Sequence, residues 1–568
     1  MKSFIVTIDQ KRIKAKTGQT VLELAQKNNI DIPALCYHPD LKTRGSCRLC
    51  LIEIKGKKGL HTSCSIRVEP NMVVITDSPE IRRARRVNLE LIFAQHKEEC
   101  VDCGLNLNCN LLKLAKEYEV DIHRLVDRKT KYRSIQFGPS IFFDRSKCID
   151  CGNCVEVCEK QGIGFLETKE GGHNFQIIPS AKKNIDCIYC GQCIVHCLVE
   201  ALRTVNDLEK AEKLLNQKNK IVVFQFAPSI RTSIGEEFGM KHSSVVTGKL
   251  IAAIRKLGVA EVFDVSVGAD FTTIEEANEL IEKLEMDDLP LFTSCCPAWV
   301  KYVEFYEPEF MKNLTTVRSP HIILGGLIKN YWAKKKNIDA KNISVVSVMP
   351  CVSKKYEIER KEMNIDGLRP VDHVLTTREL AHFLKKKKID LTTIKEEKPS
   401  LMFGSATGGG IIYGASGGVM ESALRTVHHK LTKRKLPKIE FKEVRGASGF
   451  KKASVKIGKR TLKIAVVNGI NNAKKILEEL KENPSKYDYV EIMACPGGCI
   501  GGGGQPIPNN AEIRIKRAKG LYSIDQKKEI RLSDQNLIVK KIYKEFLKKN
   551  NVYKLLHTKY YSKKKEVK

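Results

Sequence analysis

The chain has 568 residues, a formal net charge of +32 and a hydrophobic fraction of 42%. Its length exceeds one ordinary hydrophobic core, so several domains are expected, and the apolar content excludes a disordered chain. The lysines are spread along the whole chain and no basic strip is interleaved with aromatic residues, which argues against a nucleic-acid partner. The charge instead fits an acidic protein partner or a lysine-rich surface.

The first ten residues alternate as a strand does, and they lack the apolar stretch and cleavage site of a signal peptide. No apolar run reaches the ~18 residues of a membrane helix. We therefore expect a cytoplasmic protein without membrane insertion. Thiols stay reduced in that compartment, so the 20 cysteines indicate metal sites rather than disulfides.

Residues 1–78 are predicted to form a β-grasp domain of the [2Fe–2S] ferredoxin type. Residues 4–8 and 11–16 are expected to pair as a hairpin, followed by a helix over 21–28. The cysteine pattern, one long loop and one Cys-x2-Cys pair, resembles that of plant-type ferredoxins, whereas a four-cysteine zinc site usually has two short pairs. The expected ligands are Cys36, Cys47, Cys50 and Cys64.

Residues 79–135 are predicted to form a small helical domain, with a charged, Arg-rich helix over 81–95 and an amphipathic helix over 111–120. Between the helices lie one imidazole and three thiols. This donor set suits zinc or an iron–sulfur cluster, and spacing alone does not choose between them. The donors are His96, Cys100, Cys103 and Cys109.

A run of four cysteines occurs twice within residues 136–208. Four thiols within eleven residues suit one tetrahedral zinc poorly, whereas a bacterial ferredoxin with two [4Fe–4S] clusters takes three ligands from one run and the fourth from the other. This domain is therefore predicted to hold two clusters. One ligand set is Cys148, Cys151, Cys154 and Cys197, and the other is Cys187, Cys190, Cys193 and Cys158.

The second half of the chain alternates strand and helix patterns, which predicts a large α/β domain with parallel strands over 215–535. A C-terminal helix and basic tail follow over 536–568. We also expect a linker at 206–220, a basic irregular insertion at 428–460 and a frayed tail from Ser562. Strands are expected at 220–226, 262–267, 343–348, 462–467 and 489–492, and helices at 249–257, 274–284 and 537–551.

Three cysteine-containing loops follow strand-like runs in this half, at 293–299, 349–355 and 493–506. The last is rich in glycine but lacks the Gly-Lys-Ser/Thr of a phosphate-binding loop. Because α/β sheets place ligands beyond the carboxyl ends of their strands, the three loop tips are expected to meet at one edge of the sheet.

These loops make the chain resemble an iron-only, or [FeFe], hydrogenase of the long bacterial and protist type, over nearly its whole length. The resemblance implies an H-cluster, in which a [4Fe–4S] subcluster is joined to a two-iron subcluster carrying CO, cyanide and a dithiolate amine bridge. It implies three accessory [4Fe–4S] clusters and one [2Fe–2S] cluster. The implied H-cluster ligands are Cys296, Cys351, Cys495 and Cys499, the last of which bridges to the two-iron unit.

These assignments use every cysteine except Cys295. A free thiol beside a catalytic metal is a reasonable proton donor, and the resemblance implies that role. Lys354 is implied to supply a charged donor to cyanide. The remaining implied contacts of the cofactor are Ala227, Pro228, Ser229, Met349 and Met493.

The resemblance also implies a proton path of Glu276, Glu279 and Thr315 together with Cys295; without the resemblance, exposed helix glutamates would be preferred. Three departures from the family pattern lie near this region. Lys283 stands where Arg is expected, Ala298 where Gly is usual, and His321 where Gln usually follows Ser319-Pro320.

The predicted function is reversible reduction of protons to H₂, with electrons exchanged with ferredoxin or a flavoprotein subunit through the accessory clusters. Maturation proteins are implied for the two-iron unit. Alternatives are the catalytic subunit of a multisubunit NAD(P)-linked or electron-bifurcating hydrogenase, a complex I-like electron-transfer subunit, an assembly factor for cytosolic iron–sulfur proteins and a hydrogen sensor. The three cysteine loops argue against the complex I-like subunit. The intact Cys295, Lys354 and glycine loop argue against the assembly factor and the sensor.

Overall fold

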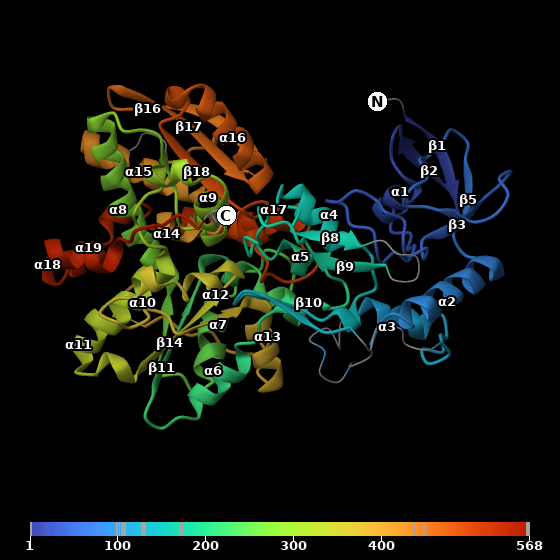
Figure 1. The fold of residues 1–568 in the computed structure, drawn as a ribbon, viewed down its shortest axis with the longest axis horizontal. Helices are drawn as coiled ribbons and strands as arrows, with labels where there is room; N and C mark the ends of the chain where they lie inside the picture. The colour runs from blue at the N-terminus through green and yellow to red at the C-terminus, as the bar shows by residue number, and fades with distance from the viewer. Residues whose placement is uncertain are drawn as a thin grey trace.

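The computed structural model describes residues 3–97, 100, 103, 109–125, 132–169, 175–400, 402–434, 439–446 and 449–563. The N-terminal unit lies at one end of the molecule, the two-cluster unit lies in the middle, and the second half of the chain forms the large body at the other end (Figure 1). The order of the units along the chain is thus also their order in space.

The N-terminal unit is one mixed sheet of order β2-β1-β5-β3-β4, with β1 antiparallel to β2 and parallel to β5. A capping box between Thr20 and Glu23 starts its helix, whose apolar residues pack on the sheet. The predicted hairpin and helix are both present. The elements are β1 (Ser3–Ile8), β2 (Lys11–Lys16), α1 (Val21–Lys27), β3 (Leu51–Ile54), β4 (His61–Thr62) and β5 (Val73–Ile75).

Helices α2 (Pro79–Phe93) and α3 (Asn110–Glu117) follow, as the sequence predicts. Arg85 of α2 is buried and donates to the carbonyls of Leu49 and Leu51 at 2.9 Å and to the Tyr118 hydroxyl at 2.8 Å. One side chain thereby fastens α2 to the cysteine loop before it and to the end of the helix after it.

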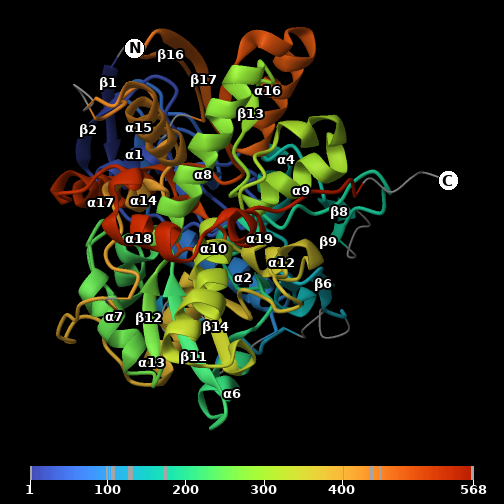
Figure 2. The same ribbon diagram turned by 90° about the vertical axis from the view of Figure 1, so that its left-hand side faces the viewer.

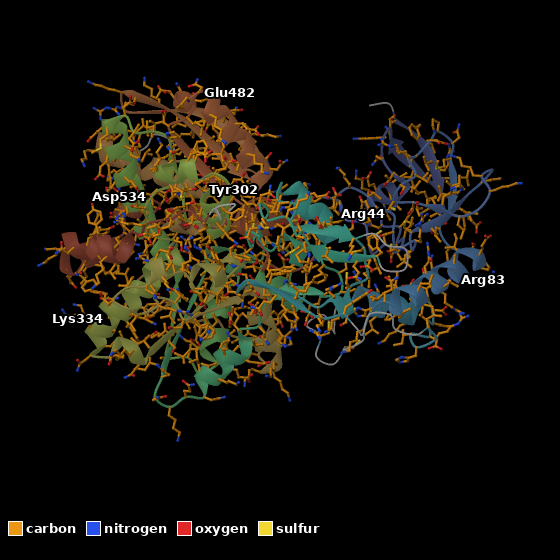
Figure 3. The ribbon with its side chains drawn as sticks, in the orientation of Figure 1. Arg44, Arg83, Tyr302, Lys334, Glu482 and Asp534 are labelled. Carbon is orange, nitrogen blue, oxygen red and sulfur yellow. The ribbon has the colours of Figure 1, made fainter. Side chains whose placement is uncertain are left out.

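The middle unit repeats one local structure, a helix that begins directly after a glycine with positive φ. Gly152 (φ 78°) precedes the first of these helices and Gly191 (φ 71°) the second. Its elements are β6 (Ile135–Phe137), β7 (Ile141–Phe143), α4 (Asn153–Lys160), β8 (Leu166–Lys169), β9 (Gln176–Pro179), α5 (Gln192–Val195) and β10 (Leu202–Thr204). Arg44 of the first unit lies where the two units meet (Figure 3).

The second half contains two four-stranded sheets, ordered β12-β11-β14-β15 and β13-β18-β17-β16. The first sheet is parallel throughout, and β16 is antiparallel in the second. In both views the sheets lie one above the other, with α14 between them and α8 running from the first sheet along the second (Figures 1 and 2). The strands are β11 (Ile221–Phe226), β12 (Glu261–Asp264), β13 (Leu291–Phe292), β14 (Ile343–Met349), β15 (His373–Thr376), β16 (Phe450–Ile457), β17 (Arg460–Asn468) and β18 (Tyr489–Met493).

The helices of this half cover the sheets and connect them. Fully buried aromatic side chains, including Phe224, Phe226 and Phe263, fill the core beside the first sheet. The helices are α6 (Leu208–Leu215), α7 (Thr247–Arg255), α8 (Val265–Met286), α9 (Pro297–Tyr306), α10 (Pro320–Leu327), α11 (Ala333–Lys336), α12 (Ser353–Glu357), α13 (Thr377–Lys386), α14 (Gly408–Ile412), α15 (Gly418–Thr432), α16 (Ile470–Glu482), α17 (Ala511–Lys527), α18 (Leu537–Glu545) and α19 (Lys549–Leu556).

Four sequence predictions need correction here. The strand predicted at 262–267 ends at Asp264, which accepts a hydrogen bond from the Ser266 N–H and caps α8. The linker predicted at 206–220 contains α6, which buries Leu208 and Ala211. The irregular insertion at 428–460 contains β16, and the single helix predicted at 537–551 is divided into α18 and α19.

The C-terminal segment is better ordered at its start than predicted, because the Lys563 N–H donates to the Glu304 carbonyl at 2.8 Å. The rest of the predicted frayed tail lies outside the described residues. Across the described part of the chain, no helix is both long and apolar enough to cross a membrane.

Candidate active site

The three cysteine loops lie at the carboxyl ends of strands from both sheets of the large body. Cys296 follows β13, and Cys495 and Cys499 follow β18, in the second sheet; Cys351 follows β14 in the first sheet. The prediction that the loops meet at one edge of one sheet is therefore wrong in its geometry. The site lies between the ends of two sheets.

The four predicted H-cluster cysteines are close enough to influence one another. Burial, and next the neighbouring thiol of Cys296, raise the pKa of Cys351 to about 12. Burial and the thiols of Cys351 and Cys296 raise the pKa of Cys495, and they act on Cys499 in the same way. In the bare protein these sulfurs are thiols, so binding a cluster as thiolates releases protons.

A cavity beside these thiols is lined by residues from both sheets and from α8, α10 and α12. Its lining includes nearly every residue predicted to contact the cofactor, together with Cys295, Lys354 and His321. The Ser229 hydroxyl is fully buried and has no hydrogen-bond partner among the described residues. Thiolate sulfurs, a soft methionine wall and an orphaned hydroxyl fit an iron cofactor with polar diatomic ligands. The predicted contacts in the lining are Ala227, Pro228, Ser229, Met349, Met493, Cys351 and Cys499.

Lys354 places a buried positive charge at this cavity. Its Nζ donates to Glu357 Oε2 at 2.8 Å and to the Cys295 carbonyl at 3.1 Å. Burial alone would lower the pKa of Lys354, but Glu357 raises it above its ordinary value. The pKa of Glu357 is held at about 2, against its burial, by Lys354 and His321. The cation is therefore retained in the interior.

The predicted proton path lies along α8 and the loop that begins with Thr315. Burial raises the pKa of Glu276 to about 8, and the carboxylate of Glu279 contributes. The charge of Glu276 in turn acts on the Cys295 thiol, whose pKa is raised first by burial. Glu279 accepts a hydrogen bond from the Thr315 hydroxyl and two from the Thr316 N–H at 3.1 Å. The structure thus brings these predicted residues together.

Sequence reasoning missed two further groups at this site. Tyr413 lines the cavity, and Glu276 and Cys295 both influence it. Glu357 is the partner of Lys354, and its position three residues later on the same helix was an available signal. Tyr413 stands outside any cysteine loop, so the sequence offered no comparable signal for it.

The structure shows the surroundings of the three residues that depart from the family pattern. Ala298 is buried at the start of α9, behind Cys296, and Lys283 forms a salt bridge with Asp288 at 2.5 Å. His321 contacts Glu357 at the cavity wall.

The middle unit brings its cysteines together in the two interleaved sets that the sequence predicts. After burial, the thiols that raise the pKa of Cys154 are headed by Cys148, Cys151 and Cys197. A second cavity has all four cysteines of the other set in its lining, Cys158, Cys187, Cys190 and Cys193. This proximity is compatible with the predicted exchange of Cys158 and Cys197 between the runs, and the two ligand sets stay predictions.

This unit touches the glycine loop of the active site. The Cys495 thiol points to the Cys190 carbonyl at 3.9 Å. A Cβ added at Gly503 would lie 2.6 Å from Gly191 Cα, so only glycine allows these two backbones to pack so closely. The close approach places a predicted cluster ligand of the middle unit beside a predicted H-cluster ligand.

In the N-terminal unit, the four predicted [2Fe–2S] ligands are also neighbours. A hydrogen bond with Cys50 lowers the pKa of Cys64 to about 7, while Cys36 and Cys47 act on it in the opposite direction. Cys36 also influences Cys151 of the middle unit.

The structure does not test the predicted one-His, three-Cys site, because most of the chain between His96 and Cys109 lies outside the described residues. His96 Nδ1 lies 2.8 Å from the Lys147 carbonyl, and the Cys103 thiol donates to Glu200 at 3.3 Å. Both contacts face the middle unit. The set stays a prediction.

Comparison with family models gives a match along most of the chain. The model described as "Iron only hydrogenase large subunit, C-terminal domain" matches residues 220–503. Accessory matches are a 2Fe-2S iron-sulfur cluster binding domain over 2–79, an NADH-ubiquinone oxidoreductase-G iron-sulfur binding region over 85–124, a 4Fe-4S dicluster domain over 147–201 and an iron hydrogenase small subunit over 511–563.

Individual relatives agree. The chain is 37% identical to the NADP-reducing hydrogenase subunit HndD of Solidesulfovibrio fructosivorans, over 99% of both chains. It is 37% identical to iron hydrogenase 1 of Clostridium pasteurianum, over 95% of this chain and 97% of that one. A solved structure of the [FeFe]-hydrogenase from Chlamydomonas reinhardtii is 34% identical with a TM-score of 0.57, covering 64% of this chain and 100% of that one. With its cluster-binding domains and its three cysteine loops, the chain belongs to the iron-only, or [FeFe], hydrogenase family.

Proposed function

We propose that this chain catalyses the reversible reduction of protons to H₂ at an H-cluster held by Cys296, Cys351, Cys495 and Cys499. When bound, the cluster supplies the iron chemistry that makes and splits H₂. The observation that carries the proposal is the cavity beside these cysteines, because it gathers the residues expected around a two-iron unit from both sheets. Lys354 and the Ser229 hydroxyl would donate to the cofactor's cyanide groups.

The chain's own residues handle the protons. Cys295 lies at the cavity, Glu276 is the next ionisable group, and Glu279 with Thr315 lies farther along α8. A pKa of about 8 keeps Glu276 protonated at neutral pH, so its carboxyl can both release and accept a proton. Glu276 thus lies between the Cys295 thiol and the less buried Glu279 carboxylate, which is the order that a proton relay requires.

Electrons would enter through the accessory clusters. The route is supported by the approach of successive units. Cys36 influences the thiol of Cys151, and the Cys495 thiol points to the Cys190 carbonyl. Ferredoxin or a flavoprotein subunit would be the donor, and maturation proteins would supply the two-iron unit. We propose a cytoplasmic location, as for an enzyme that exchanges electrons with such carriers.

Infrared spectroscopy of the matured protein tests the proposal, together with H₂ production from a reduced viologen dye and from reduced ferredoxin. We expect bands from iron-bound CO and cyanide and H₂ from both donors. Bands without any H₂ would indicate a sensor, and absence of the bands would remove the H-cluster assignment.

A second candidate is the catalytic subunit of a multisubunit NADP-linked hydrogenase. It is favoured by the relative named as an NADP-reducing hydrogenase subunit, which matches this chain over 99% of both lengths. In that case the isolated chain would not reduce NADP⁺ with H₂, and addition of the missing flavoprotein subunit would restore the activity. NADP⁺ reduction that stays absent after this addition would favour the ferredoxin-linked enzyme.

A further inference from the structure

We propose that His321 is a positioning residue of the active site, which holds the Glu357 carboxylate in place and thereby keeps the Lys354 ammonium directed into the cavity. The inference rests on the proposed function, because Lys354 matters there as the charged donor to the cofactor. His321 itself stands on α10, and its imidazole reaches Glu357 at the end of α12.

The contacts form one chain of hydrogen bonds that crosses the core. Gln225 Nε2 lies 2.5 Å from Ser347 Oγ, and Ser347 Oγ lies 3.2 Å from His321 Nδ1. His321 Nε2 lies 2.6 Å from Glu357 Oε2, the same oxygen that accepts from Lys354 at 2.8 Å. Strands β11 and β14 are thus tied through α10 to the cation of α12.

The order of donors and acceptors in these hydrogen bonds determines which nitrogen of the His321 ring carries the proton. The Gln225 amide nitrogen can only donate, so the Ser347 hydroxyl is free to donate its own proton to Nδ1 of His321. Nε2 then carries the ring proton and donates it to the Glu357 carboxylate. Burial, and next the charge of Lys354, lower the pKa of His321 to about 4, which agrees with a neutral ring.

Burial makes each contact matter. His321 is 1% exposed, Glu357 4% and Lys354 8%. Removal of the imidazole would leave Glu357 with Lys354 as its only side-chain donor among the described residues. The Glu357 carboxylate would then be held from one side only, and Lys354, whose other acceptor is the Cys295 carbonyl, would be positioned less exactly at the cavity. Glutamine at this position keeps an N–H donor, whereas leucine does not.

The main experiment compares His321→Leu with His321→Gln in the matured full-length protein. For His321→Leu we expect full iron content, displaced infrared bands of iron-bound cyanide and dye-driven turnover lower by about tenfold, since a hydrogen bond to a charged group is worth about that factor. His321→Gln should restore the band positions and most of the turnover. His382→Leu, an exposed change on α13, is the matched control and should resemble the parent.

A double-mutant cycle separates positioning from mere packing. If His321 acts through Glu357, His321→Leu should displace the bands and reduce turnover in the parent but add little in a Glu357→Gln background. Equal effects in both backgrounds would overturn the proposal. Parent-like bands and turnover in His321→Leu would also overturn it.

If the His321→Leu protein does not acquire its cofactor, the Ser347→Ala variant tests the proposal instead. This change removes only the hydroxyl that donates to Nδ1, so it should displace the cyanide bands in a smaller degree, and unchanged bands would overturn the proposal. A parent protein without CO and cyanide bands would instead refute the H-cluster assignment.

Discussion

The two halves of the chain assemble their cysteines in different ways. In the middle unit, each predicted ligand set takes three cysteines from one short run, and the helices α4 and α5 hold the two runs against each other. In the large body, Cys296, Cys351 and Cys495 come from distant parts of the sequence and meet between the ends of two sheets. The comparison teaches that local spacing brings together three of the four cysteines of each predicted electron-transfer site, whereas the predicted catalytic site depends on how distant strands of the second half are arranged.

The largest test of this difference removes one cysteine from each half. Cys499→Ala should abolish retention of the two-iron unit and all H₂ production, because its thiolate is the only expected protein ligand to that unit. Cys47→Ala should leave dye-driven H₂ production nearly intact, since it removes only a predicted accessory ligand in the N-terminal unit, next to Cys36. Iron analysis and gas chromatography measure both outcomes, and unchanged two-iron content in Cys499→Ala would contradict the assignment.

The second-largest effect is expected at Cys295, which lies in the second half of the chain and is not a predicted ligand. Cys295→Ser should keep every cluster and lower turnover by ~10²–10⁴-fold in both directions, because relay groups contribute about that factor. Cys295→Asp, which restores an ionisable group, should retain more activity. A serine variant that turns over like the parent would eliminate the relay, and one that loses iron would make Cys295 a ligand.

The contribution of the N-terminal cluster-binding units should be measurable when the electron donor is a protein. Cys47→Ala is expected to lower ferredoxin-driven H₂ production several-fold more than dye-driven production, because the [2Fe–2S] unit lies at the far end of the molecule from the large body (Figure 1). The ratio of the two rates is the measurement. Equal losses with both donors would mean that electrons do not enter through the N-terminal unit.

The smallest expected effect is on stability and concerns Glu276 of α8. Its pKa rises from 4.5 in the unfolded chain to about 8 in the folded one, chiefly through burial. The folded state therefore binds a proton that the unfolded chain has released, and the stability from this group is full below about pH 4.5 and is lost as the pH approaches 8. Glu276→Gln should weaken this decline, which thermal unfolding at pH 5 and pH 8 would reveal. An identical pH dependence in both proteins would refute a buried neutral carboxyl.

Much of the organisation was predictable from the sequence by itself. The interleaved sets predicted around Cys154 and Cys193 came from the repeated four-cysteine run, read with the ligand arrangement of bacterial ferredoxins. The strand at β11 followed from a continuous apolar run, and the helices α2 and α3 followed from periodicity. The family followed from three short loops, because the cysteines of each can be recognised in the sequence without knowledge of the fold.

Only the tertiary structure decided where those loops meet and what else joins them. The predicted single sheet is two sheets, because among the described residues β17 and β18 pair with β13 and β16 and not with any strand of the first sheet. No local pattern specifies a partner strand. Tertiary packing places Tyr413 at the cavity and Glu357 against His321. It also brings the backbones of Gly191 and Gly503 together. Spacing determines which residues can share a metal, but burial and long-range pairing decide the charge and proton environment in which that metal would work.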